Sequence, residues 1–328
     1  MSLTCPRSAR GDHMREETMG NYTLFRPRDR ENNFILSVAM TTVKMLFFVV
    51  LLIGVAALGL GVGVGKAWVD TSPMLDLDVL HSQSQTSFIY DKYGELITEY
   101  KGSENRIYVE LDEVPQNLID AVVSIEDARF WEHNGIDIKR IGGAFISTFF
   151  RGDTQGGSTI TCQLIKLTLL TSDQNFRRKV QEAYLALELE EQMTKEQIME
   201  AYLNVIYLGG SSYGVCIAAQ DYFGKDLDEL TLRECATLAG MIRNPSRYNP
   251  RSNYYSRNTP EVTDDRADYV LELMHEQGYI TDEEYQQAMN EQLVVQESSS
   301  ATSSEMYDHA YYVEYAIYDV VTKMLRVE

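Results

Sequence analysis

Residues 125–135 read IEDARFWEHNG, and they place a carboxylate within an apolar helical pattern. Val122, Glu126 and Phe130 follow at intervals of four, which puts them on one face of a helix. Three further apolar residues widen that face, which is then expected to point inward: Leu118, Ala121 and Ile125. A carboxylate there finds a partner or resists ionisation, because desolvation disfavours its charged form. Glu126 is therefore a candidate proton acceptor, although a Glu at the edge of the stripe with its carboxylate in water explains the pattern equally well.

A second feature is the uncharged stretch from Met45 to Val64, which has twenty residues. Twenty helical residues cross a hydrocarbon core of about 30 Å, whereas buried core helices seldom run this long without a polar face. The stretch exceeds a signal-peptide core and no clear cleavage site follows it, so we predict an uncleaved transmembrane signal anchor over residues 38–66. Basic residues near the span are in excess on its N-terminal side. This bias predicts a cytoplasmic N-terminus, with the residues after about 67 outside the cytoplasmic membrane.

The charge of the chain is unevenly distributed. Residues 1–66 contain 8 basic and 5 acidic side chains, a net charge of +3. Since the whole chain carries −20, the remainder carries −23. Such an acidic surface repels nucleic acid, which we exclude as a partner.

Four cysteines are present, of which Cys162, Cys216 and Cys235 follow the membrane segment. Their odd number and wide spacing do not form a disulfide framework, and no C-x-x-C pair suggests a metal site. We expect these three to be small buried hydrophobic residues.

The rest of the chain divides by composition. Residues 88–97 predict two short strands around a Gly-containing turn, and residues 115–290 have helical patterning almost throughout. Three helix starts carry capping boxes: Thr194 with Gln197, Thr231 with Glu234, and Thr281 with Glu284. The predicted organisation has five parts: a cytoplasmic tail (1–37), the signal anchor (38–66), a tether (67–85), a folded domain (86–290), and a Ser-rich linker with the incomplete start of a following region (291–328).

The apolar stretch 141–150, IGGAFISTFF, has arginines on both flanks. Ten residues are too few to span a bilayer, but they can lie in its interface. A buried helix explains the stretch equally well.

Two polar segments are candidates for anion binding. Gly156-Gly157 opens a predicted helix that includes Lys166, so free N–H groups and a cation lie near each other. The segment is not a Walker A motif, and a simple N-cap by Ser158 or Thr159 is an adequate explanation. Farther along, Arg178, Lys179 and Glu182 are spaced as a solvated ion-pair face or as a cation cluster ordered by a carboxylate.

The order of these segments resembles the glycosyltransferase domain of class A penicillin-binding proteins and of the related monofunctional peptidoglycan glycosyltransferases. The resemblance covers roughly residues 86–290 and rests on five blocks in sequence order: EDARFWEHNGID, GGSTITCQLIK, RKVQEAYLALELE, IMEAYLNVIYLG, and the stretch from AAQDYFGK to LAGMIRNPSRYNP. A signal anchor before the domain also fits that family.

The resemblance implies a mainly α, lysozyme-like fold with a small β element, preceded by one transmembrane helix. Residues 141–150 would belong to a membrane-embedded hydrophobic jaw. The implied activity is polymerisation of lipid II, with the growing glycan as donor. The implied partners are lipid II, the glycan strand, the lipid bilayer and other cell-wall synthesis proteins. No cofactor is required by the resemblance, although a divalent cation (Mg²⁺ or Mn²⁺) is compatible with it.

Matching positions imply roles for individual residues. Glu126 would be the general base that deprotonates the acceptor's 4-hydroxyl, and Glu182 the second glutamate, which orients cations or a metal. Fixed cations would stabilise the pyrophosphate that leaves. The implied substrate-binding residues are Asp127, His133, Thr159, Gln163, Lys166, Arg178, Lys179 and Asn204.

The chain departs from the family pattern at two positions. Cys162 stands where a second Gln is usual, and Leu167 stands where Asn usually follows the lysine. Both departures bear on the affinity of the donor groove rather than on proton transfer. No S-x-x-K, S-x-N and K-T-G set is present, so we expect no transpeptidase here.

Two other functions compete with polymerisation. A lysozyme-like hydrolase would need a carboxylic acid that protonates a sugar oxygen, but it would have no use for the cation cluster. A non-catalytic cell-wall scaffold would not need Glu126 or Glu182, and both are present.

Overall fold

The structure is a computed structural model that describes residues 29–77, 87–90, 92–93, 96–100, 107–140, 158–170 and 175–297, together with Tyr315 and Lys323. It divides into two units, Met1–Gly63 and Val64–Glu328. The predicted jaw segment 141–150, the glycines at 156 and 157 and the Ser-rich linker lie outside the described residues.

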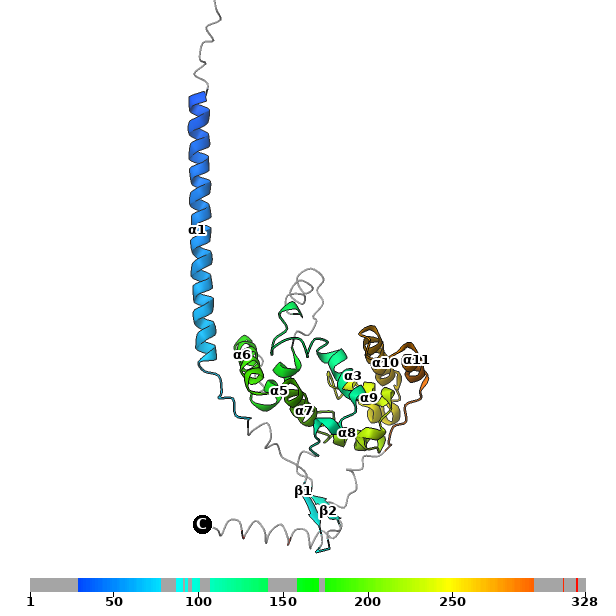
Figure 1. Cartoon of the computed structure of the whole chain (residues 1–328). Coiled ribbons are helices and arrows are strands. Elements are labelled where there is room, and N and C mark those ends of the chain that lie inside the picture. Colours follow the sequence, from blue (N-terminus) through cyan, green and yellow to red (C-terminus); the bar gives the residue numbers. More distant parts are fainter. Residues whose placement is uncertain are drawn as a thin grey trace, which may run out of the picture. The chain divides into compact units, whose positions relative to one another are not determined.

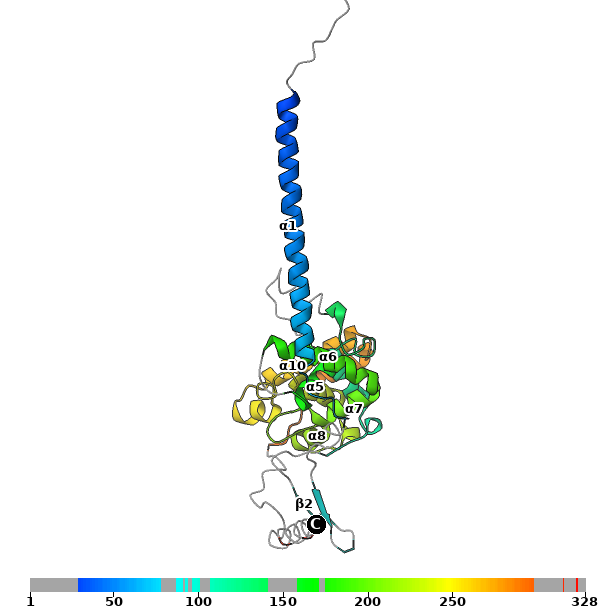
Figure 2. The ribbon, with the colours of Figure 1, turned by 90° about the vertical axis from the view of Figure 1, so that its left-hand side faces the viewer.

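The first long element is α1 (Asp29–Val69), an unbroken helix of 41 residues (Figures 1 and 2). Its stretch Leu36–Val69 has a mean hydropathy of 2.8 and none of it is buried, so it is long and apolar enough to cross a membrane. The helix starts at Asp29, inside the segment predicted as a tail. Continuing a helix costs less than nucleating one, so the polar residues before the apolar stretch can extend it.

The small β element is confirmed as an antiparallel hairpin. Strand β1 (Ser87–Tyr90) pairs with β2 (Leu96–Tyr100), with Ser87 opposite Tyr100 and a register irregularity between Ile89 and Tyr90. The rest of the described chain after α1 is helical or irregular, so the prediction of a mainly α fold is confirmed.

Helices of the domain form two groups that are visible in Figure 1. In the first, α5 (Ile160–Thr168) packs against α6 (Phe176–Gln192) and α7 (Lys195–Val205). In the second, α3 (Gln116–Glu126) packs against α9 (Leu232–Met241) and α10 (Glu261–Glu276). The remaining elements are η1 (Leu111–Glu113), α8 (Val215–Phe223), η2 (Leu227–Glu229), the π-helical turn η3 (Ser252–Ser256) and α11 (Asp282–Asn290).

Local sequence signals explain where several of these helices begin. All three predicted capping boxes are formed, at Thr194, Thr231 and Thr281, and each threonine side chain accepts the N–H of the residue three positions on. Helix α8 ends at Gly224, whose φ of 67° is left-handed. The three described cysteines are free and buried, as expected.

The packed domain reaches beyond the predicted boundaries of 86 and 290. At its end, Leu293 and Val295 are buried, and the backbone N–H of Gln296 donates to the Tyr222 carbonyl at 2.7 Å. Before it, the Gln181 amide donates to the Trp68 and Thr71 carbonyls, inside the segment predicted as a tether. Composition changes mark these boundaries only loosely, because a polar segment can still pack through a few apolar side chains.

Candidate active site

Helix α3 ends at Glu126, and this end exposes the carboxylate on one side of the domain. Val122 and Phe130 are fully buried as predicted, but Phe130 lies in a turn after the helix and not on the helix itself. Asp127 stops the helix because its φ of −156° and ψ of 73° are not helical. The prediction of one continuous helical stripe is therefore wrong beyond Glu126, and Glu126 itself is half-buried.

A chain of hydrogen bonds fixes the Glu126 carboxylate. The Gln163 amide of α5 donates to Glu126 Oε2 at 2.7 Å, and the Tyr202 hydroxyl of α7 donates to Gln163 Oε1 at 2.9 Å. Because Tyr202 occupies the carbonyl of Gln163, the amide nitrogen must face Glu126. Burial, helped by the nearby charges of Glu126 and Asp127, raises the pKa of Tyr202 well above 10, so Tyr202 remains a donor. Tyr202 is not among the site residues predicted from the sequence.

Asp127 and His133 join the turn after α3 to the start of α5. Asp127 is 1% exposed, and its Oδ2 contacts His133 Nε2 at 2.9 Å and accepts the Ile160 N–H at 3.0 Å. The guanidinium of Arg140 lies 3.6 Å from Oδ1 and also donates to the Glu126 carbonyl. These contacts hold the backbone next to Glu126 in place, so both residues position the site from behind it.

The predicted cation cluster is formed on α6. Arg178 Nε lies 3.0 Å from Glu182 Oε1, and Lys179 Nζ lies 2.5 Å from Glu182 Oε2. Glu182 is 2% exposed, and Lys179 also donates to Ser158 Oγ at the start of α5. Lys166 is exposed in the last turn of α5. The pattern on α6 is therefore an ion-pair cluster built on the buried Arg178 and Glu182, with Lys179 half exposed at its edge.

Two residues predicted to bind substrate are occupied within the protein. Thr159 is 1% exposed, caps α5 by accepting the Cys162 N–H, and donates to the Gly135 carbonyl. The Asn204 amide bonds both backbone groups of Val109 and the Glu200 carbonyl. The Gly135 backbone that accepts from Thr159 requires a glycine, because its φ is 77° and an added Cβ would lie 2.6 Å from the Ala186 carbonyl oxygen of α6.

On the open side of Glu126 lies a cavity of about 710 Å³ that includes four arginines among its lining residues. Arg129 makes a bidentate contact with Asp137: its Nε donates to Oδ2 at 3.0 Å, and its Nη2 donates to Oδ1 at 2.7 Å. Burial alone would raise the pKa of Asp137, but hydrogen bonds from the Arg140 backbone and from Arg129 lower it below its usual value. The other two arginines are Arg243, after α9, and Arg266 of α10. Sequence reasoning missed both.

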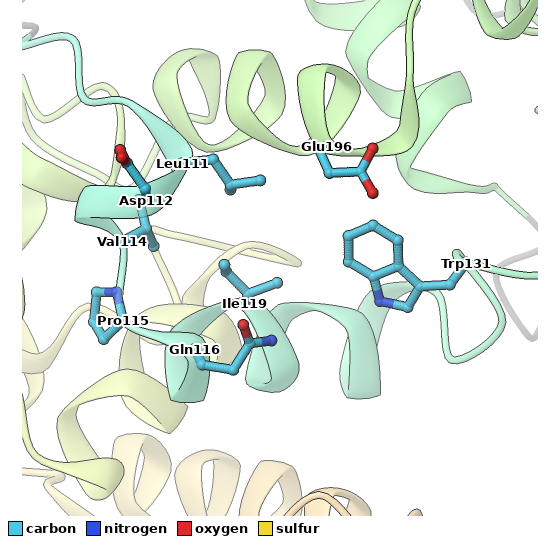
Figure 3. Close-up of a pocket in the computed structure, with 8 residues that line it drawn as sticks. All are labelled: Leu111, Asp112, Val114, Pro115, Gln116, Ile119, Trp131 and Glu196. Carbon is cyan, nitrogen blue, oxygen red and sulfur yellow. The ribbon is translucent and has the colours of Figure 1, made fainter.

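A second groove, of about 650 Å³, lies between η1, α3 and α7 (Figure 3). Leu111, Ile119 and Trp131 give it apolar walls, and its charged lining residues are Asp112 and Glu196. A groove whose charged residues are acidic does not suit a phosphate. The Glu126 cavity is therefore the candidate active site.

Donor groups for a divalent cation do not converge here. Both oxygens of Glu182 contact cations, and among the described residues no group of three or more His, Cys, Asp or Glu side chains could hold a metal. The described part of the site is built to bind anions through nitrogen groups.

A comparison with known protein families decides the identity of this domain. The family model described as "Transglycosylase" matches residues 93–275, more than half of the chain. The chain belongs to the transglycosylase family. The match includes Glu126, the α6 cluster, Arg243 and Arg266.

Curated relatives of this transglycosylase are similar over about three quarters of the chain. Penicillin-binding protein 1A of Streptococcus pneumoniae is 43% identical over 76% of this chain and 34% of its own length. That of Clostridium novyi is 46% identical over 70% and 28%, and penicillin-binding protein 1A/1B of Bacillus subtilis is 42% identical over 75% and 26%. The chain thus spans between about a quarter and a third of the length of these relatives. A crystal structure of penicillin-binding protein 1A from Haemophilus influenzae is 29% identical over 75% of this chain and 25% of that chain, with a TM-score of 0.38.

Proposed function

We propose that this domain is a peptidoglycan glycosyltransferase that polymerises lipid II into β-1,4 glycan strands in bacterial cell-wall synthesis. One observation carries the proposal: the Glu126 carboxylate is held by Gln163 on one side and opens on the other into the arginine-lined cavity. A fixed carboxylate beside a cationic cavity suits a base that acts on a phosphate-bearing substrate.

In the proposed reaction, Glu126 accepts the proton of the 4-hydroxyl of the acceptor sugar. That oxygen attacks the anomeric carbon of the donor from the side opposite the leaving group, which inverts the configuration. The bond from this carbon to the diphosphate breaks, and undecaprenyl pyrophosphate departs with the electron pair. Because the Gln163 amide donates to Glu126 Oε2, it fixes the orientation of the carboxylate that would accept this proton.

The charge that develops on the leaving diphosphate needs fixed cations. Arg178 and Lys179 are held by the buried Glu182, and Ser158 connects Lys179 to the start of α5. Lys166 is exposed on α5 and adds a third positive charge. Cations ordered before the substrate binds need not reorganise during the reaction, which is the condition for electrostatic stabilisation of a transition state.

The proposed location is the cytoplasmic membrane of a bacterium, crossed once by α1. The excess of basic residues before the span favours an N-terminus in the cytoplasm and a catalytic domain on the extracytoplasmic side. There the domain would meet lipid II, the growing strand and the bilayer, and it would work with other cell-wall synthesis proteins.

Lipid II incubated with the purified full chain in detergent tests this function, with the products separated by length. Wild type should yield glycan polymer, and Glu126→Gln should polymerise at least about 100-fold more slowly, because a general base contributes that much or more. Glu196→Gln is the matched control, since Glu196 is exposed and lines the other groove. Polymer from Glu126→Gln at the wild-type rate would overturn the general-base role, and cleavage of preformed strands without polymer would indicate the hydrolase.

A further inference from the structure

The four arginines of the Glu126 cavity differ in their partners. Arg129 is paired with Asp137, and Arg140 lies near Asp127. Arg243 and Arg266 form no ion pair with any residue that the structure describes. An arginine keeps its charge at any physiological pH, so an unpaired one in a cavity needs water or an anion.

Arg266 is held rigidly and is only partly hydrated. Its Nε donates to the Gly240 carbonyl at 3.1 Å, and its guanidinium carbon lies 5.2 Å from the Tyr248 ring centre and 5.7 Å from that of Tyr269. Burial lowers the pKa of Arg266 from its usual value. The Arg266 guanidinium is thus held against the rings of Tyr248 and Tyr269, and its terminal N–H groups are left for another acceptor.

Arg243 adds a second positive charge to the same cavity. It is exposed just after the end of α9, and its charge disfavours that of Arg266, whereas the Glu126 charge favours it. Because neither arginine forms an ion pair with a described carboxylate, both keep guanidinium N–H groups that an anion can accept. The Glu126 carboxylate lies in the same cavity and is already hydrogen-bonded to Gln163.

These arginines are separate from the cations of α6. Lys166, Arg178 and Lys179 belong to the group of α5 and α6, and none of them lines the Glu126 cavity. Arg243 and Arg266 belong to the group of α9 and α10, which packs against α3. Glu126 connects the two regions, because it ends α3 and is bonded to α5 through Gln163.

We infer that Arg243 and Arg266 bind the diphosphate of the acceptor, while the α6 cluster receives the diphosphate that leaves the donor. This inference rests on the proposed function, in which each turnover involves two diphosphates, one released and one retained. Phosphate oxygens suit two guanidinium groups, which present their donors as planar forks. The two arginines are positioning residues that orient the acceptor hydroxyl toward Glu126.

Binding of inorganic pyrophosphate tests the site without using activity. Titration calorimetry on the full chain in detergent, with Lys179→Gln as background to weaken the α6 site, should show remaining binding. Adding Arg243→Gln should weaken that binding about tenfold, the usual cost of losing one charged hydrogen bond, and Arg243→Lys should restore part of it. Arg247→Gln is the control, because Arg247 is exposed nearby and does not line the cavity.

A second measurement separates the diphosphate from a carboxylate as the source of the anion. A soluble stem peptide without phosphate should bind equally well to wild type and Arg243→Gln. If Arg243→Gln lowers the affinity for the stem peptide and leaves the affinity for pyrophosphate unchanged, the inference is overturned. In polymerisation with saturating glycan donor, Arg243→Gln should raise the KM for lipid II at least about fivefold, with kcat changed less than twofold.

The two proposals fail in distinguishable ways. Polymerisation by Glu126→Gln at the wild-type rate would overturn the general-base role of Glu126, but the pyrophosphate-binding result would still hold. Equal pyrophosphate binding by Arg243→Gln and Arg247→Gln would overturn the proposed acceptor-diphosphate site, but it would not affect the proposed role of Glu126. Since Arg243 is exposed, its substitution should not prevent folding.

Discussion

The cations of α6 differ from Arg243 and Arg266 of the Glu126 cavity in whether a carboxylate of the protein pairs with them. Arg178 and Lys179 share the buried carboxylate of Glu182, so their positions are set before any ligand arrives. Arg243 and Arg266 have no ion-pair partner among the described residues and repel each other. A paired cluster is rigid but partly neutralised, whereas an unpaired one keeps its full charge for a ligand. The difference suits a site that must stabilise one diphosphate as it forms and hold another throughout.

Breaking the paired cluster should give the largest effect. Glu182→Gln leaves Arg178, which is 9% exposed, without its carboxylate, and removing one partner of a buried pair costs about 3 kcal/mol. Urea unfolding of the full chain in detergent should show this loss. Glu188→Gln on the same helix is the control and should change stability by less than about 0.5 kcal/mol. Equal stability of the two variants would mean that Glu182 does not organise the cluster.

A smaller effect is expected where α5 and α7 support Glu126. Tyr202→Phe removes the hydroxyl that fixes the Gln163 amide, at a cost of about 1 kcal/mol in unfolding free energy. Because Gln163 is then free to turn, kcat for polymerisation should fall several-fold more than the KM changes. Tyr207→Phe is a suitable comparison, since that hydroxyl donates to the exposed Gly210 carbonyl at 3.3 Å. If the two variants have the same kcat, Gln163 does not depend on Tyr202.

The smallest effect concerns Arg129, the cavity arginine with a bidentate carboxylate partner. The pKa of Asp137 is lowered in the folded protein, so its pair stabilises the fold above the usual Asp pKa of about 4. That stability is lost as pH falls below 4 through the lowered value. The stability gap between wild type and Asp137→Asn should therefore shrink from pH 6 to pH 3. Asp112→Asn, in the groove of Figure 3, should show no comparable change.

The sequence predicted the site only in part. The family resemblance predicted roles for Glu126, Gln163 and the α6 cations, and the structure joins Gln163 to Glu126 and the α6 cations to Glu182. The substrate contacts predicted for Thr159 and Asn204 stay predictions, and both side chains bond within the protein. Sequence reasoning missed Arg243 and Arg266, although one signal was present: neither has an acidic residue three or four positions away on a helix. Such a signal is weak, because an arginine can find its partner anywhere in the fold.

Local order was determined by the sequence itself. The three capping boxes, the long apolar helix and the hairpin depend on residues a few positions apart, so periodicity and spacing were enough to predict them. Only the tertiary structure decided which side chains meet. Gln163 lies 37 residues from Glu126 and 39 from Tyr202, and Arg243 and Arg266 reach the same cavity from the turn after α9 and from α10. Those contacts follow from how the helices pack, because hydrophobic burial, unlike a helix cap, has no fixed spacing along the chain.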